Sequence, residues 1–365
     1  MTTDTPRPAP AAQPEPAAQP EPAAQPAPAA KPRLVQYDLV RAVAMTWVII
    51  EHSLQVIDWG EPGRIWYAAL ESVVLTCNVV FFALSGKFNL GVSASRDPRR
   101  FYLKRIVSVV LPTALFFFVR GLYDMRGDYG SVANVLSLFV SNSLGGLGKS
   151  EYWFLFVLIG LLAVAPFLAL VVNGASKTLQ RIFMAMGIGW LAVSLLARDT
   201  GVGLYWSFLF SGYCFPFMAG RFIEDLLRGC KSWALLLAAL ACSAANAYLD
   251  LTGLTGGIYA ETPFYILAGL LYFVVLVRLG ERLREGSLVQ RAIAFAARHS
   301  FTVYLVHYMV LDWLLVHGFP NPAGLRSLVV QPVFALVILV VSLAIAAAVD
   351  TLVIQPVSRR LLKRI

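Results

Sequence analysis

An arginine and a histidine share one face of an apolar segment near the start of the chain. Arg41 and His52 lie in residues 34–57, most of which are apolar, and are eleven positions apart. On a helix this spacing returns to within about 20° of the starting direction, about 16 Å further along the axis. A neutral imidazole can take a proton from a hydroxyl near pH 7, so His52 has the chemistry of a general base for acyl transfer. Asp38 lies near the same stripe, and a local i, i+3 pair with Arg41 is the alternative explanation of these charges.

A second histidine lies in another apolar segment. His307 and Tyr304 are i, i+3 neighbours and would face the same way on a helix. By themselves they fit a hydrogen bond between packed helices better than catalysis. Glu151 and Trp153 begin a further apolar run, where tryptophan is expected as an interface anchor.

The sequence lacks the motifs of several enzyme classes. It contains no G-x-S-x-G, H-E-x-x-H or P-loop pattern, which leaves serine-hydrolase, zincin and NTPase functions unsupported. The four cysteines have no C-x-x-C spacing, so we expect neither a disulfide framework nor a metal site.

The composition is that of an integral membrane protein. Of 365 residues, 58% are hydrophobic and only 14% are charged, and the mean hydropathy is +0.68. The net charge of +9 comes largely from short loops between apolar runs, so it indicates membrane topology and not nucleic-acid binding. Residues 1–33 contain repeated AAQPEP-like hexapeptides, which predict an extended cytoplasmic tail and not a cleaved signal peptide.

About ten apolar runs are long enough to cross a bilayer, which needs about 20 residues each. We therefore predict an all-α polytopic membrane protein with a membrane domain at 34–355 and a basic cytoplasmic tail at 356–365. A shorter apolar segment at 131–140 is expected to be re-entrant or interfacial, and the glycine-rich residues 141–148 are expected to form a loop. The ten predicted spans are 34–57, 66–91, 105–123, 152–173, 178–197, 203–222, 232–250, 261–280, 299–317 and 328–354.

Basic residues predict the orientation of these spans. Alternate ends carry most of the lysine and arginine, in segments 31–33, 96–105, 177–181, 221–231, 278–298 and 359–364. The positive-inside rule therefore predicts that both termini are cytoplasmic. On this orientation His52 lies in the outer half of the membrane, and Arg41 lies near the cytoplasmic side.

The predicted cytoplasmic side gathers cations inside or next to the spans. Arg41, Lys87 and Arg105 would ring one mouth of the bundle, beside the basic loop that contains Arg99 and Arg100. Clustered guanidinium and ammonium groups pair with phosphate, so this mouth is suited to a polyanion. The alternative is that the loop residues bind lipid headgroups or only set the topology.

Four segments together resemble acyltransferase family 3, the ten-helix membrane acyltransferases that modify bacterial polysaccharides. The resemblance covers about 34–355. Its motifs are D-x-x-R with R-x10-H (Asp38, Arg41, His52), F-F-x-L-S-G-K-F at 81–88 (Ser85, Lys87), the basic block Arg99, Arg100 and Arg105 before Pro112, and W-F-L at 153–155 with Y-L-x-H at 304–307.

The resemblance implies acyl transfer across a bacterial inner membrane. It implies an acyl-CoA donor, most often acetyl-CoA, on the cytoplasmic side, and an acceptor hydroxyl on a cell-surface or lipid-linked glycan. His52, Arg41 and Asp38 are then the catalytic candidates. The donor-binding candidates are Arg41, Ser85, Lys87, Arg99, Arg100 and Arg105, and the acceptor-binding candidates are Glu151, Trp153, Tyr304 and His307.

Several alternatives stay open at this stage. His52 could act as a base or carry the acyl group, and the group could be succinyl passed to a periplasmic glucan. A separate periplasmic transferase could complete the reaction, because the chain ends soon after the last predicted span. A secondary transporter is the strongest rival class, since intramembrane charges also line ion pathways. A non-catalytic subunit of a polysaccharide export system is a third possibility.

Overall fold

A computed structural model of the protein describes residues 34–125, 130–145, 151–200, 212–254, 262–319 and 324–363. Every regular element in these residues is a helix, which confirms the predicted all-α class. Within them, nine helical stretches are long and apolar enough to span a membrane. The predicted tail at 1–33 lies outside the described residues, as does much of the predicted span at 203–222.

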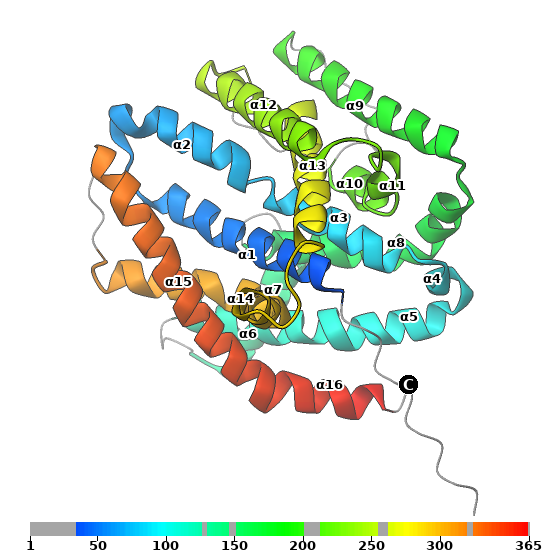
Figure 1. Cartoon of the computed structure of the whole chain (residues 1–365). Coiled ribbons are helices and arrows are strands. Elements are labelled where there is room, and N and C mark those ends of the chain that lie inside the picture. Colours follow the sequence, from blue (N-terminus) through cyan, green and yellow to red (C-terminus); the bar gives the residue numbers. More distant parts are fainter. Residues whose placement is uncertain are drawn as a thin grey trace, which may run out of the picture. The chain divides into compact units, whose positions relative to one another are not determined.

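The helices follow the chain in a simple order (Figure 1). Three of the nine candidate spans are built from several consecutive elements, and α4, α7, α10 and α11 are short. The elements are α1 Val35–Val56, α2 Gly60–Val74, α3 Cys77–Asn89, α4 Val92–Arg96, α5 Pro98–Arg105, the π-helical η1 Ile106–Val110, α6 Leu111–Asp124, α7 Val132–Gly145, α8 Trp153–Gly174, α9 Lys177–Asp199, α10 Cys214–Ala219, α11 Ile223–Leu226, α12 Ser232–Leu251, α13 Pro263–Gly280, α14 Leu288–Val316, the 3-10 turn η3 Gly324–Arg326, α15 Ser327–Val349, the π-helical η4 Asp350–Ile354 and α16 Gln355–Leu362.

Local capping sets where some helices begin. The Ser287 side chain accepts a hydrogen bond from the backbone N–H of Gln290, so α14 starts at Leu288 and not at the predicted residue 299. Arg291 and Arg298 therefore lie on a helix, whereas the sequence analysis assigned them to a loop. The prediction failed because hydropathy detects the part of a helix that is apolar and misses a polar extension.

The short helix α7 also differs from its prediction. Its 14 residues are too few for a span, in agreement with a re-entrant or interfacial segment. Helix α7 continues to Gly145, however, so the prediction of a loop at 141–148 is wrong for residues 141–145. Residues 146–150 lie outside the described residues. Serine and asparagine are weak helix formers but do not end a helix on their own.

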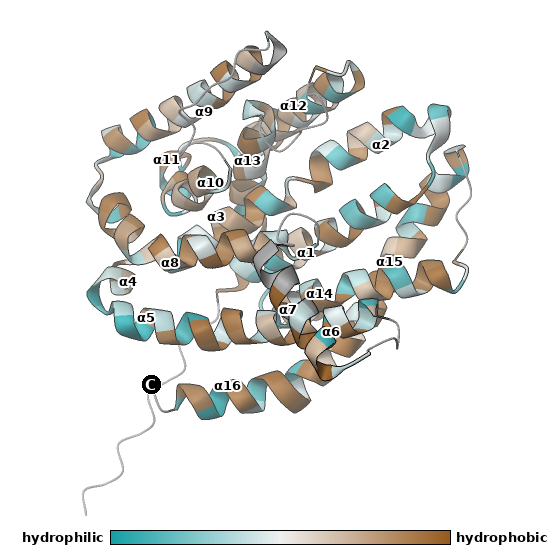
Figure 2. Cartoon of the chain, turned by 180° about the vertical axis from the view of Figure 1, so that it is seen from behind, coloured by the Kyte–Doolittle hydropathy of each residue, from teal (hydrophilic) through white to brown (hydrophobic). Residues whose placement is uncertain are grey.

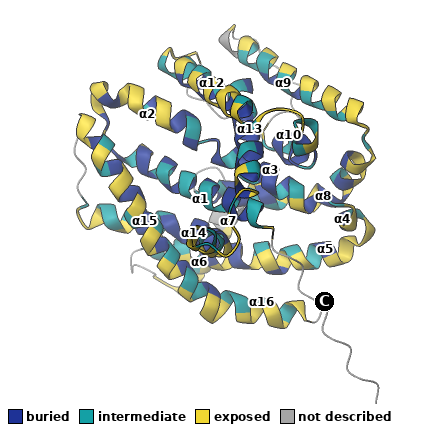
Figure 3. Cartoon of the chain, in the orientation of Figure 1, coloured by how far each residue is buried: buried dark blue, intermediate teal, exposed yellow. Residues whose placement is uncertain are grey.

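The core of the bundle is formed around α1, which packs against α14, α13, α3, α15 and α2. In the apolar window of α13, 72% of residues are buried, against 11% for α9, so α13 is central and α9 is peripheral (Figure 3). Exposed apolar residues nevertheless occur along α8, α9 and α15, and these helices carry many residues coloured as hydrophobic in Figure 2. Exposed apolar surface of this extent is expected where helices face lipid.

Two glycines allow α3 and α10 to touch. A Cβ on Gly86 would lie 1.7 Å from the Phe217 carbonyl oxygen, and one on Gly220 would lie 2.0 Å from the Ala83 carbonyl oxygen. Gly86 thus lies at a contact between the two backbones, since only glycine leaves room for it. This contact fixes α3 just before Lys87.

Candidate active site

His52 is part of a stack of aromatic rings between α1 and α14. Its ring lies 5.2 Å from that of His307, with an interplanar angle of 29°. The Tyr308 ring stands nearly perpendicular to His52 at 5.4 Å. Next to it on α1, the buried Glu51 places Oε2 3.1 Å from Nδ1 of His52, and Gln55 donates to the other Glu51 oxygen.

The tautomer of His307 follows from its partner. His307 is fully buried, and its Nδ1 lies 2.6 Å from the Tyr304 carbonyl oxygen, which can only accept. Nδ1 therefore carries the proton, and Nε2 holds a free lone pair in the neutral ring. Among the described residues this buried Nε2 has no hydrogen-bond partner. A buried nitrogen base beside His52 is a group that can transfer a proton.

An ion pair between Arg120 and Glu151 lies against this ring stack. Arg120 lies 2.6 Å from Glu151 and 2.9 Å from Asp124. Its guanidinium also lies 5.1 Å from the centre of the Tyr308 ring, which is within the range of a cation–π contact. Burial raises the pKa of the Glu151 carboxyl, and the Arg120 charge opposes this shift.

The predicted acceptor residues divide into two groups. Tyr304 donates to the Glu151 backbone carbonyl and packs 5.5 Å from the His307 ring, so these three predicted residues form one cluster that meets His52 through His307. Trp153 instead packs on Tyr213, at 5.3 Å, and on its neighbour Phe154. Its described contacts are aromatic packing.

Arg41 and Asp38 lie toward the other end of α1 from His52. Arg41 is 3.3 Å from the buried Asp38, as the local-pair alternative expected, and its guanidinium lies 4.9 Å from the Phe88 ring. Helix rise separates residues 41 and 52 by about 16 Å. Any role of these two residues in the chemistry at His52 must therefore act through a ligand that spans this distance.

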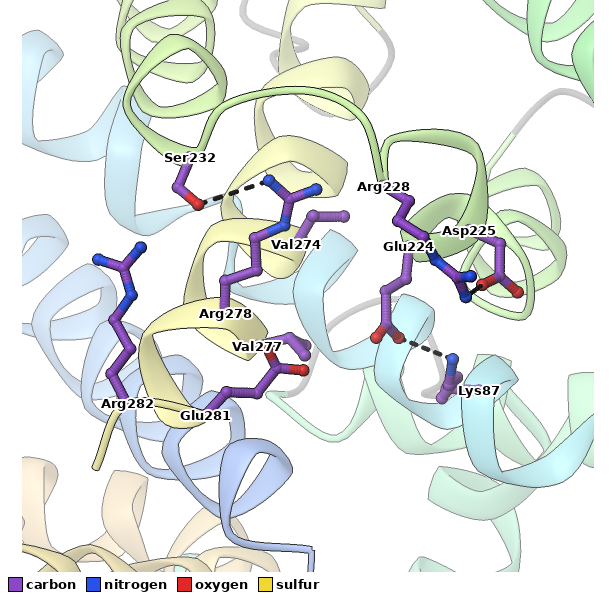
Figure 4. Close-up of a pocket in the computed structure, with 10 residues that line it drawn as sticks. All are labelled: Lys87, Glu224, Asp225, Arg228, Ser232, Val274, Val277, Arg278, Glu281 and Arg282. Atoms are coloured by element: carbon purple, nitrogen blue, oxygen red, sulfur yellow. Dashed lines mark hydrogen bonds and ion pairs between the residues drawn. The ribbon is translucent and has the colours of Figure 1, made fainter. Parts of the chain in front are cut away.

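Lys87 opens onto a pocket of about 600 Å³ between α3, α11, α12 and α13 (Figure 4). Its other basic lining residues are Arg228, Arg278 and Arg282. From the sequence, these three arginines contribute only to the predicted topology. Arg278 lies in the last turn of α13, and Arg228 and Arg282 follow the ends of α11 and α13, so their convergence depends on how α11 packs against α13.

The remaining predicted donor residues do not line this pocket. Arg99 and Arg100 are exposed on α5. Arg105 lies over the Phe101 ring, at 5.3 Å, and its buried Nε has no partner among the described residues. Ser85 is half-buried, and its backbone carbonyl accepts a hydrogen bond from Asn89.

Tyr308 is the site residue that sequence reasoning missed. It follows His307 directly in the sequence, but nothing in its spacing predicts that it joins Arg120 to His52. In the described chain no group of three histidine, cysteine or acidic side chains is placed to hold a metal ion.

The fold and this stacked histidine pair define a multi-pass membrane protein with the groups needed for proton transfer inside its helix bundle. A family model for an acyltransferase domain, that of acyltransferase family 3, matches residues 34–350. The chain therefore belongs to this family and is an acyltransferase. Comparisons with curated proteins and with solved structures gave no significant match.

Proposed function

We propose that the protein transfers an acetyl group from acyl-CoA to a hydroxyl of a cell-surface or lipid-linked glycan at a bacterial inner membrane. The observation that carries the proposal is the arrangement along α1. A stacked pair of histidines, the buried His307 and the partly buried His52, lies at one end of the helix, and a pocket lined by arginine and lysine lies near the other. Phosphate binding at the basic end would bring a thioester toward His52.

Acyl transfer at His52 can be written with every bond and proton accounted for and without a metal ion. In the direct mechanism, an unprotonated His52 nitrogen takes the proton of the acceptor hydroxyl while the hydroxyl oxygen attacks the thioester carbonyl. The carbon–sulfur bond breaks, and the thiolate that leaves receives the proton from the imidazolium. The products are an ester and a free thiol. In the alternative mechanism the imidazole first carries the acyl group and releases it to the acceptor.

The stacked His307 supports both versions. Its Nε2 lone pair can accept a proton close to His52, so one ring can hold the proton while the other reacts. Glu51 lies next to Nδ1 of His52 and can stabilise the imidazolium that forms. The Arg120–Glu151 pair holds Tyr308 against the same ring.

The test is thiol release from acetyl-CoA and succinyl-CoA by purified protein, together with mass spectrometry of surface glycans from a deletion strain. His52→Ala should abolish transfer and keep CoA binding. His317→Ala is the matched control, because His317 is exposed and stacks only on Trp313 among its described ring contacts. Full turnover by His52→Ala would reject the proposed role, and ping-pong kinetics would select the acyl-carrier mechanism.

A further inference from the structure

The carboxylate of Glu224 lies in the pocket beside Lys87, where it occupies the position that a bound anion would take. Its Oε1 is 2.9 Å from Nζ of Lys87, and the Tyr37 hydroxyl lies 3.2 Å from both carboxylate oxygens. The carboxylate points toward Lys87 in Figure 4. An ammonium group and a hydroxyl donor converging on one anion also make up a binding position for a phosphate oxygen.

The segment that carries Glu224 is a short one. Helix α11 has only four residues, and turns precede and follow it. Arg278 of α13 holds this segment by donating to the backbone carbonyls of Leu227 and Cys230, at 2.6 and 2.5 Å. The anchor thus acts on the backbone after Glu224, while the Glu224 side chain is held by Lys87 and Tyr37.

Besides Lys87 and Glu224, the pocket is lined by three cations, Arg228, Arg278 and Arg282, and by two carboxylates, Asp225 and Glu281. Arg228 pairs with Asp225 at 2.6 Å, and Arg282 is an exposed residue one turn beyond Arg278. A volume of about 600 Å³ is within the range of small-molecule sites. The pocket can therefore accept several phosphate oxygens.

We propose that Glu224 is a placeholder anion at a phosphate subsite, and that the phosphates of the acyl donor displace it from Lys87 and Tyr37. The ligand class is the nucleoside phosphate part of an acyl thioester. This inference rests on the proposed acyl-CoA donor. Tyr37 and His52 are both on α1, and helix rise separates them by about 22 Å, so a donor held here would extend along α1 toward His52.

The test measures CoA binding to the full chain in neutral detergent by calorimetry, together with the KM for acyl-CoA. In Glu224→Gln the competing charge is lost, so the Kd for CoA and the KM should fall about three- to tenfold. Arg282→Gln should raise both about fivefold, because it removes a phosphate partner. Pantetheine lacks the phosphates, so its binding should be equal in all variants.

Two matched controls remove the same charges outside the pocket. Glu285 and Arg284 are exposed residues of the connection between α13 and α14 and do not line the pocket. Glu285→Gln and Arg284→Gln should leave the Kd for CoA within about twofold of the original protein. Thermal melting checks that each variant is folded, and Arg282→Gln keeps the test decisive if Glu224→Gln is unstable.

The possible outcomes distinguish failure of the proposed phosphate subsite from failure of the proposed function. Normal turnover with an unchanged Kd in both Glu224→Gln and Arg282→Gln would reject the subsite and leave the function standing. Absence of both CoA binding and turnover in the original protein would reject the proposed donor itself.

A lipid headgroup has the same phosphate chemistry. If nanodiscs with phosphatidylglycerol weaken CoA binding in the original protein but not in Arg282→Gln, the pocket is a lipid site and the proposal is wrong.

Discussion

The imidazole rings of His52 and His307 stack 5.2 Å apart although they belong to helices from opposite ends of the chain. His307 is fully buried and keeps an unpartnered Nε2 among the described residues. Because α1 packs closely against α14, the pair is a fixed feature of the bundle core. Two nitrogen bases in contact can divide proton acceptance and proton donation between them.

Replacement of His307 tests this division of roles. His307→Asn retains an N–H that can donate to the Tyr304 carbonyl but removes the Nε2 base. We expect kcat to fall by about 10²- to 10⁴-fold, the usual contribution of general acid–base catalysis. Steady-state kinetics with acetyl-CoA measure the loss, and His317→Asn is the control. A kcat within about twofold of the original would show that His307 is only a packing residue.

Removal of one partner of the Arg120–Glu151 ion pair should destabilise the protein more than removal of both partners, because it leaves the other charge buried and unpaired. Arg120→Met leaves a buried carboxylate without its guanidinium, which costs up to about 3–5 kcal/mol of stability. Arg120→Met with Glu151→Gln removes both charges and should recover part of this loss. Thermal melting of the four proteins in a double-mutant cycle measures the coupling. Equal melting temperatures in the single and double variants would contradict this account.

The pH dependence of stability should report on Glu151. Burial raises the pKa of this carboxyl above its ordinary value of 4.5, so the native state holds the proton more tightly than the unfolded state. The stabilisation from this proton is fully present below the unfolded-state pKa and is lost as the pH rises through the higher native pKa. Relative to Glu151→Gln, the melting temperature of the original protein should therefore fall as the pH rises above the ordinary carboxyl pKa of 4.5.

The exposed Glu285 provides the control for this pH series. Glu285→Gln should run parallel to the original protein across the same range, because its carboxyl is in water in both states. If the original protein instead gains stability over Glu151→Gln as the pH rises, the Arg120 charge outweighs burial at this site.

Hydropathy was sufficient to predict the membrane class and most spans, because lipid requires long apolar helices. It was also enough to single out Arg41 and His52, since charged groups in such helices are rare. The stacking of His52 on His307 depends on which helices pack together, and no local pattern contains that information. The role of Glu224 depends on tertiary contacts in the same way, because the acidic pair Glu224-Asp225 in a basic segment has no distinguishing spacing.

The crossing of α3 and α10 should tolerate no side chain at Gly86. A Cβ there would lie 1.7 Å from the Phe217 carbonyl oxygen, so Gly86→Ala must push the two helices apart. We expect a loss of about 1–3 kcal/mol or more of stability, as for other overpacked sites. Because Lys87 follows Gly86 directly, the KM for acyl-CoA should also rise.

Gly160→Ala on α8 is the matched control, since its Cβ would meet nothing within 4 Å. It should leave stability unchanged or raise it by up to about 1 kcal/mol through helix propensity. Equal melting temperatures and equal KM values in the two variants would show that the α3–α10 contact is not tight.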